Sequence, residues 1–90
     1  MSMKMTGDPE RGWEFYKVEM EPGARSRSEA HTEGVEETVT VIHGQAIISA
    51  GVMHETLTEG ETLVFSGHQA HEYQNASEEL TILHVILQYK

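Results

Sequence analysis

A histidine, two glutamates and several valines share one alternation in the stretch from residue 31 to residue 44. The odd positions of this stretch hold His31, Glu33, Val35, Glu37, Val39 and Val41. A β-strand sends alternate side chains to the same face, roughly 6.5–7 Å apart. A carboxylate on an otherwise apolar face is costly unless another group pairs with it. The pattern therefore predicts a strand that carries a polar site, with the valines continuing its face into a core.

The charge of the chain is strongly acidic and unevenly distributed. The formal net charge is −9, and residues 28–89 contain no lysine or arginine but ten glutamates and all six histidines. This distribution excludes direct binding to nucleic acid, which needs clustered cations against the phosphates. Acidity by itself is typical of a soluble surface. Histidine and glutamate without basic neighbours also suit a bound cation.

Length and composition indicate one small domain of 90 residues. The chain has no cysteine, which excludes disulfides and thiol catalysis and agrees with a cytoplasmic location. Residues 1–10 lack the pattern of a signal peptide, and no stretch reaches the length of a membrane span. We expect residues 1–10 to form a flexible segment and residues 11–90 to form the folded domain.

Short strands separated by turn signals account for the rest of the chain. Strand patterns cover Trp13–Met20 and residues 37–42, 45–50, 52–57, 62–65, 70–74 and 80–89. The last of these is the longest apolar run and reads as a fully buried closing strand. No stretch has the spacing and the caps of a helix. The sequence predicts an all-β protein, a sandwich or a small antiparallel barrel.

The residues around the central strand match the first motif of a known family. Gly23, His31, Glu37 and Gly44 follow the order of its glycine, histidine, glutamate and closing glycine. The chain thereby resembles the cupin superfamily, small antiparallel barrels of the jelly-roll type. Glu33 stands where that motif has its second histidine.

The second cupin motif is matched further along the chain. Gly60, His71 and Asn75 fall at the spacing of its glycine, histidine and asparagine, whereas Ser66 and His68 replace its proline and glycine. Together the two motifs extend the resemblance over residues 13–89. The stretches AHTEGVEE and GETLVFSGHQAHEYQN are similar to the cupin sensor domains that follow a helix-turn-helix in bacterial transcription regulators.

The resemblance implies a metal site made of His31, Glu37 and His71, with Glu33 as a fourth ligand. Two imidazoles and one or two carboxylates suit Zn(II), Fe(II), Mn(II) or Ni(II). Tyr73 shares a strand face with His71 and is predicted to contact a ligand above the metal. The alternative is a site without metal, in which Glu37 and His71 bond to each other.

The resemblance implies two functions, and a third function is kept as an alternative. The first is a small-molecule binding module, the ligand sensor of a transcription regulator or a free-standing relative. In it Glu33 and Tyr73 contact the ligand, and Arg25 pairs with a ligand carboxylate. The second is a small metal-dependent enzyme, an oxygenase or an isomerase, and the third is a structural or storage role. We expect a homodimer that covers the strands at Trp13–Met20 and residues 80–89.

Overall fold

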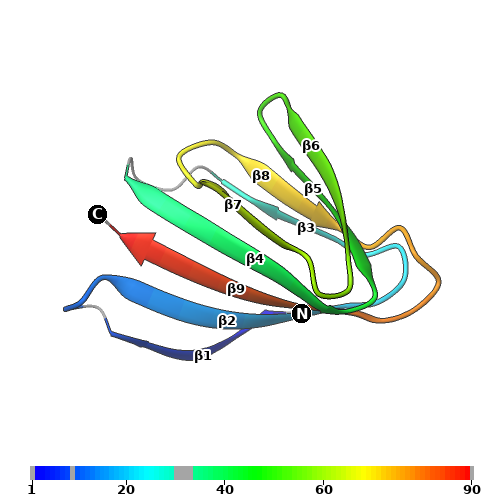
Figure 1. Ribbon diagram of the computed structural model, residues 1–90, viewed down its shortest axis with the longest axis horizontal. Coiled ribbons are helices and arrows are strands. Elements are labelled where there is room, and N and C mark those ends of the chain that lie inside the picture. The colour runs from blue at the N-terminus through cyan, green and yellow to red at the C-terminus, as the bar shows by residue number, and fades with distance from the viewer. Residues whose placement is uncertain (1, 9, 30–33, 90) are drawn as a thin grey trace.

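Two antiparallel sheets form the domain in the computed structural model, which describes residues 2–8, 10–29 and 34–89. The larger sheet has the order β1-β2-β9-β4-β7, whose strands are Ser2–Asp8, Trp13–Met20, Thr81–Tyr89, Val35–His43 and Thr62–Ser66. The smaller sheet has the order β3-β8-β5-β6, whose strands are Arg25–Ser28, His71–Gln74, Gln45–Ala50 and Met53–Thr58. The two sheets lie close together at the end where β9 begins and diverge toward the end where β9 finishes (Figure 1).

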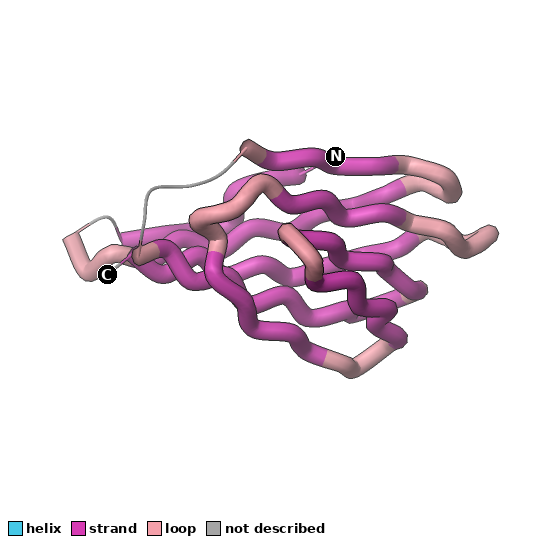
Figure 2. The backbone as a smooth tube through the Cα atoms, turned by 90° about the horizontal axis from the view of Figure 1, so that it is seen from above, coloured by secondary structure: helices cyan, strands magenta, loops and turns pink. Residues whose placement is uncertain are grey.

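Strands and short loops make up the described part of the chain (Figure 2). The all-β antiparallel fold predicted from the sequence is therefore confirmed. Within this part no helix is long and apolar enough to cross a membrane.

The central strand β4 turns its odd positions into the core. Val35, Glu37, Val39 and Val41 are 0–3% exposed, whereas the residues between them are half-buried. The predicted alternation is confirmed over the described residues of this stretch. Burying apolar surface between two sheets is the main source of stability in such a sandwich. Glu37 is thus a buried carboxylate among the valines of this strand face.

The first strand corrects one expectation. Residues 1–10 were expected to be flexible, yet Ser2–Asp8 forms β1 and pairs with β2 from Ser2↔Val18 to Asp8↔Trp13. A strand at the edge of a sheet is held by the backbone of its neighbour, so its own sequence needs no apolar pattern. The chain turns between these two strands because the Asp8 carbonyl accepts hydrogen bonds from the backbone of Arg11 and Gly12.

Asn75, the asparagine of the second motif, ties three segments together. Its side chain is fully buried, and its Nδ2 donates to the carbonyls of Met20 at 2.9 Å and Glu79 at 2.7 Å. Its Oδ1 accepts a hydrogen bond from the backbone N–H of Ser77 at 3.0 Å. A buried amide with both ends engaged fixes the course of the chain around it. This motif residue is therefore structural.

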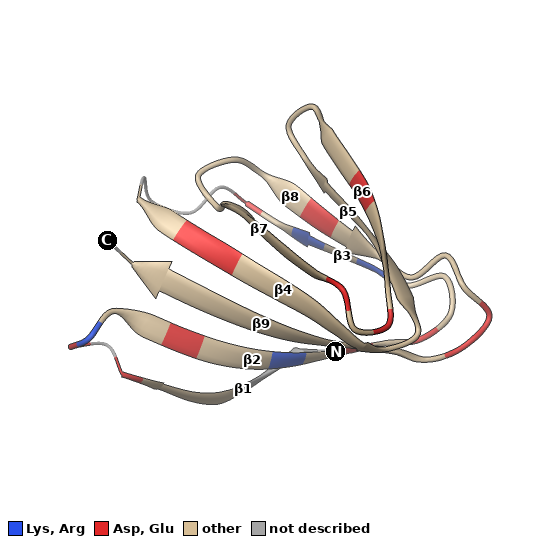
Figure 3. Ribbon diagram, viewed as in Figure 1, with Lys and Arg blue, Asp and Glu red and all other residues tan. Residues whose placement is uncertain are grey.

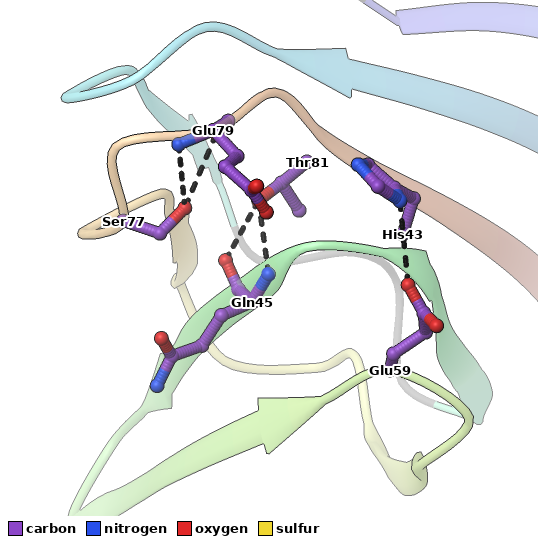
Figure 4. A network of polar contacts seen from close by, with 6 residues as sticks. All are labelled: His43, Gln45, Glu59, Ser77, Glu79 and Thr81. Atoms are coloured by element: carbon purple, nitrogen blue, oxygen red, sulfur yellow. Dashed lines mark hydrogen bonds and ion pairs between the residues drawn. The ribbon is translucent and has the colours of Figure 1, made fainter.

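Gly44, the closing glycine of the first motif, lies where β9 passes close to the turn between β4 and β5. It has φ +88°, and a Cβ on it would lie 2.5 Å from Oγ1 of Thr81. Thr81 Oγ1 donates to the carbonyl of Gln45 and accepts from its N–H (Figure 4). Only a residue without a Cβ fits where β9 passes this turn.

Figure 4 also shows an exposed pair, in which Nδ1 of His43 is 3.3 Å from Oε1 of Glu59.

Candidate functional site: a buried polar triad between the sheets

A buried ion pair connects the two sheets. Glu37 on β4 belongs to the larger sheet and His71 on β8 belongs to the smaller one. The Nε2 atom of His71 lies 2.6 Å from the Oε2 atom of Glu37, and both side chains are 1% exposed. Tyr73, two residues beyond His71 on the same strand face, donates its hydroxyl hydrogen to Oε1 of Glu37. Each carboxylate oxygen therefore has a partner from the opposite sheet.

The hydrogen bonds of His71 fix where its protons lie. Its Nδ1 is 2.9 Å from the carbonyl oxygen of Gln69, which only accepts, so Nδ1 carries a hydrogen and donates it. When the imidazole is protonated, the 2.6 Å between Nε2 and Oε2 makes the two groups an ion pair with no net charge. Glu37, His71 and Tyr73 are called the polar triad below.

Burial and charge shift the pKa values of two members of the polar triad. Burial by itself would lower the pKa of His71, but its hydrogen bonds to Glu37 and to the Gln69 carbonyl, with the charge of Glu37, raise it above 6.5. The pKa of Tyr73 is raised above 10.0 by burial first, and then by the charge and the hydrogen bond of Glu37. Tyr73 therefore stays a neutral hydroxyl at any physiological pH.

The polar triad forms part of the wall of a small pocket between the sheets. The pocket has a volume of about 160 Å³ and is lined by Tyr16, Val18, Ser26, Ser28, Glu37, His71, Tyr73, Val85 and Leu87. These residues come from β2, β3, β4, β8 and β9, so both sheets contribute to it. An apolar wall with a few converging polar groups is the usual construction of a small-molecule site.

The predicted site residues are only partly brought together. Glu37, His71 and Tyr73 meet in the pocket, whereas the predictions for His31 and Glu33 lie outside the described residues. Arg25 is not among the described residues that line the pocket. Its guanidinium is 62% exposed and lies 3.6 Å from a carboxylate oxygen of Glu72.

In the smaller sheet, basic residues of β3 lie next to an acidic residue of β8 (Figure 3). Sequence reasoning missed Ser26 and Ser28, which line the pocket. The sequence does contain a signal for these two serines, because they alternate with Arg25 and Arg27 along one short strand.

A metal ion, which cupin domains often hold, requires donor atoms that are further apart than those of the described residues. Two ligand atoms that each lie ~2.1 Å from one metal ion are about 3 Å apart when the angle between their bonds to the ion is 90°. The 2.6 Å between Nε2 of His71 and Oε2 of Glu37 is shorter, so the two atoms contact each other directly. Among the described residues no group of three histidine, aspartate or glutamate side chains gathers around one point. These residues by themselves therefore fit a direct ion pair and not a metal site.

Comparison with known proteins agrees with this architecture and defines the class. The model of the cupin domain family Cupin_2 matches residues 16–87, so the chain belongs to the cupin superfamily. The fold resembles that of the Cupin_2 domain of an XRE family transcriptional regulator from Enterobacter cloacae. The TM-score is 0.94 at 26% identity, over 100% of this chain and 96% of that one.

Two of the relatives are transcription regulators. The chain is 34% identical over 82 residues to the HTH-type transcriptional regulator SutR of Escherichia coli K12. The aligned stretch covers 91% of this chain and 46% of that protein. A regulator of the HTH_3 family from Vibrio cholerae has the same fold, with a TM-score of 0.90 and 21% identity over 99% of this chain and 50% of that one. The chain thus spans about half the length of these two regulators and is homologous to cupin domains of this type.

Proposed function

We propose that this cupin domain is a ligand-sensing module that binds a small molecule in the pocket next to the polar triad. The observation that carries the proposal is the convergence of Glu37, His71 and Tyr73 from two sheets in the wall of an apolar pocket of about 160 Å³. Homology to cupin domains of transcription regulators supports it. We also propose a cytoplasmic location, because bacterial transcription regulators meet their DNA there.

The sensing step depends on the connection between the sheets. A ligand shifts an equilibrium only by as much as it binds one state better than the other. The polar triad joins β4 of one sheet to β8 of the other, so a ligand that contacts Tyr73 acts on both. The ligand would in this way change how the two sheets pack, and through them any domain attached to either sheet.

A metabolite screen by two-dimensional NMR tests the proposed function. We expect one compound class to shift the amide resonances of pocket residues such as Val85 and to raise the melting temperature. The Tyr73→Phe variant should lose at least ten-fold in affinity for it, because a buried polar contact disappears. Tyr89→Phe is the matched control, since the Tyr89 hydroxyl also donates to a glutamate, Glu14, but at the surface. Binding that leaves the pocket resonances unchanged would contradict the proposal.

A metal-dependent cupin enzyme, an oxygenase or an isomerase, is the rival proposal. It is favoured by the position of two predicted ligands, Glu37 and His71, side by side in the pocket wall, and it requires their atoms to move apart from 2.6 Å. It requires His31 as a further ligand. Elemental analysis of protein purified without a metal column separates the two proposals. One equivalent of Zn, Fe, Mn or Ni that is lost in His71→Ala would establish the metal site and would overturn the sensor without metal.

We further propose a homodimer formed through the outer face of the larger sheet. One row of residues in register across β7, β4, β9 and β2 consists of Val64, Thr38, Ile86 and Phe15. Val64 is 53% exposed and Ile86 is 39% exposed. This row carries no charge in a chain of net charge −9, so a second copy meets no repulsion there.

Sedimentation measures the proposed dimer directly. We expect twice the mass of one chain for the protein as it stands and the mass of one chain for Ile86→Glu, because the new charge would be buried at the interface. The control is Val52→Glu, since Val52 is fully exposed at a turn, and it should stay dimeric. A monomer at the highest attainable concentration would rule out this interface.

A further inference from the structure

We propose that the ligand of this pocket is a small compound with an amino or hydroxyl head group that donates hydrogen bonds, and not a carboxylate or a phosphate. The inference rests on the proposed function, because it names the chemical class for the same pocket. It follows from the hydrogen bonds of the polar triad, from the position of the basic side chains and from the size of the pocket.

Every polar atom of His71 and the hydroxyl of Tyr73 already have a partner within the protein. Nδ1 of His71 donates to the carbonyl of Gln69 at 2.9 Å. Nε2 of His71 is paired with Oε2 of Glu37 at 2.6 Å, and the hydroxyl of Tyr73 donates to Oε1. A ligand that approaches the polar triad therefore finds no hydrogen to accept. It finds the phenol oxygen of Tyr73, which still has lone pairs to accept a hydrogen bond.

The described pocket wall contains no basic side chain to balance a negative charge. The charge of His71 is already opposed by Glu37 within 2.6 Å. The other polar groups include the neutral hydroxyls of Ser26 and Ser28. An anion buried against such a wall would lose its hydration without gaining a counter-charge, which is costly.

The arginines of β3 are directed to the other side of their sheet. Because Ser26 and Ser28 line the pocket, the alternation of the strand turns Arg25 and Arg27 outward, and both are exposed. Arg25 pairs with Glu72 at 3.6 Å. Arg27 does not line the pocket and borders an open depression whose wall includes Glu72 and His71. The net charge of −9 further disfavours an anionic ligand and favours a cationic one.

The size of the pocket limits the rest of the ligand. Its volume of about 160 Å³ is below the ~300–1,000 Å³ that is usual for drug-sized ligands. Val18, Val85 and Leu87 offer the ligand an apolar surface. The geometry therefore points to a short apolar chain or branch that ends in a hydrogen-bond donor.

A set of three matched probes tests this inference in metal-free buffer. We would titrate the protein with butylamine, 1-butanol and butyrate, which have similar apolar tails and differ in the head group. The readout is the shift of the amide resonances of Val85 and Leu87 in two-dimensional NMR spectra. We expect the amine or the alcohol to bind at least ten-fold more tightly than the carboxylate.

Each outcome decides the inference. Tighter binding of butyrate, or equal binding of all three probes, would overturn the donor-only ligand class and leave the proposed pocket in place. No response of the pocket resonances to any probe up to high millimolar concentration would overturn the inference together with the proposed function. Preference for the amine or the alcohol with shifts confined to the pocket would establish it.

Discussion

Replacing Glu37 by alanine should lower the free energy of unfolding by about 3–5 kcal/mol, because it leaves the buried imidazole of His71 and the hydroxyl of Tyr73 without their shared acceptor. Replacing Glu37 by glutamine should cost much less, about 1 kcal/mol. The carboxamide oxygen can accept from Tyr73, and its N–H can donate to Nε2 of a neutral His71, whose Nδ1 still bonds to the carbonyl of Gln69. Urea denaturation measures both losses.

The exposed pair of His43 and Glu59 is the control for this prediction. Its atoms are 3.3 Å apart, but the two side chains are 52% and 64% exposed. Exposed ion pairs contribute little, so Glu59→Ala should change the free energy of unfolding by less than about 1 kcal/mol. An equal effect of Glu37→Ala and Glu59→Ala would show that Glu37 is not buried against His71.

The second large effect is a loss of stability at alkaline pH. The pKa of His71 is raised above 6.5 in the folded state, so the folded chain holds this proton more tightly than the unfolded one. The resulting stabilisation is complete below pH 6.5 and disappears as the pH rises through the folded-state pKa. We therefore expect the free energy of unfolding to decline above pH 6.5.

The Glu37→Gln variant isolates the contribution of His71 to this pH dependence. Without the carboxylate no partner favours the charged imidazole, so the decline above pH 6.5 should disappear. Glu59→Ala should keep the decline, because its histidine partner is exposed. A variant and a parent with the same pH profile would assign the titration to another group.

Much of the fold could be predicted because local patterns determine it. The alternation in β4 places Glu37 with the valines on the core face, and the second motif places His71 and Tyr73 on one face of β8. The sequence alone did not predict which distant parts of the chain lie next to each other. The pairing of β1 with β2 depends on the backbone of the neighbour, and the hydrogen bond from Tyr73 to Glu37 depends on how two sheets pack.

The candidate site residues were also only partly predictable from the sequence. The sequence predicted that Glu37 and His71 converge, and it left open whether they hold a metal or bond to each other. The 2.6 Å between their atoms favours the direct ion pair among the described residues. The expected role of Arg25 stays an untested prediction. Its strand exposes it and turns the serines toward the pocket, an orientation that the alternation of arginine and serine along β3 indicates.

The ring nitrogens of His71, observed by ¹⁵N NMR across a pH titration, show directly whether a buried imidazolium pairs with Glu37. We expect two protonated ring nitrogens at and below pH 6.5, slow exchange of both ring hydrogens with water, and a pKa above 6.5. Ring hydrogens that exchange as fast as those of the exposed His54, or an Nε2 that carries a metal and no hydrogen, would contradict this pairing.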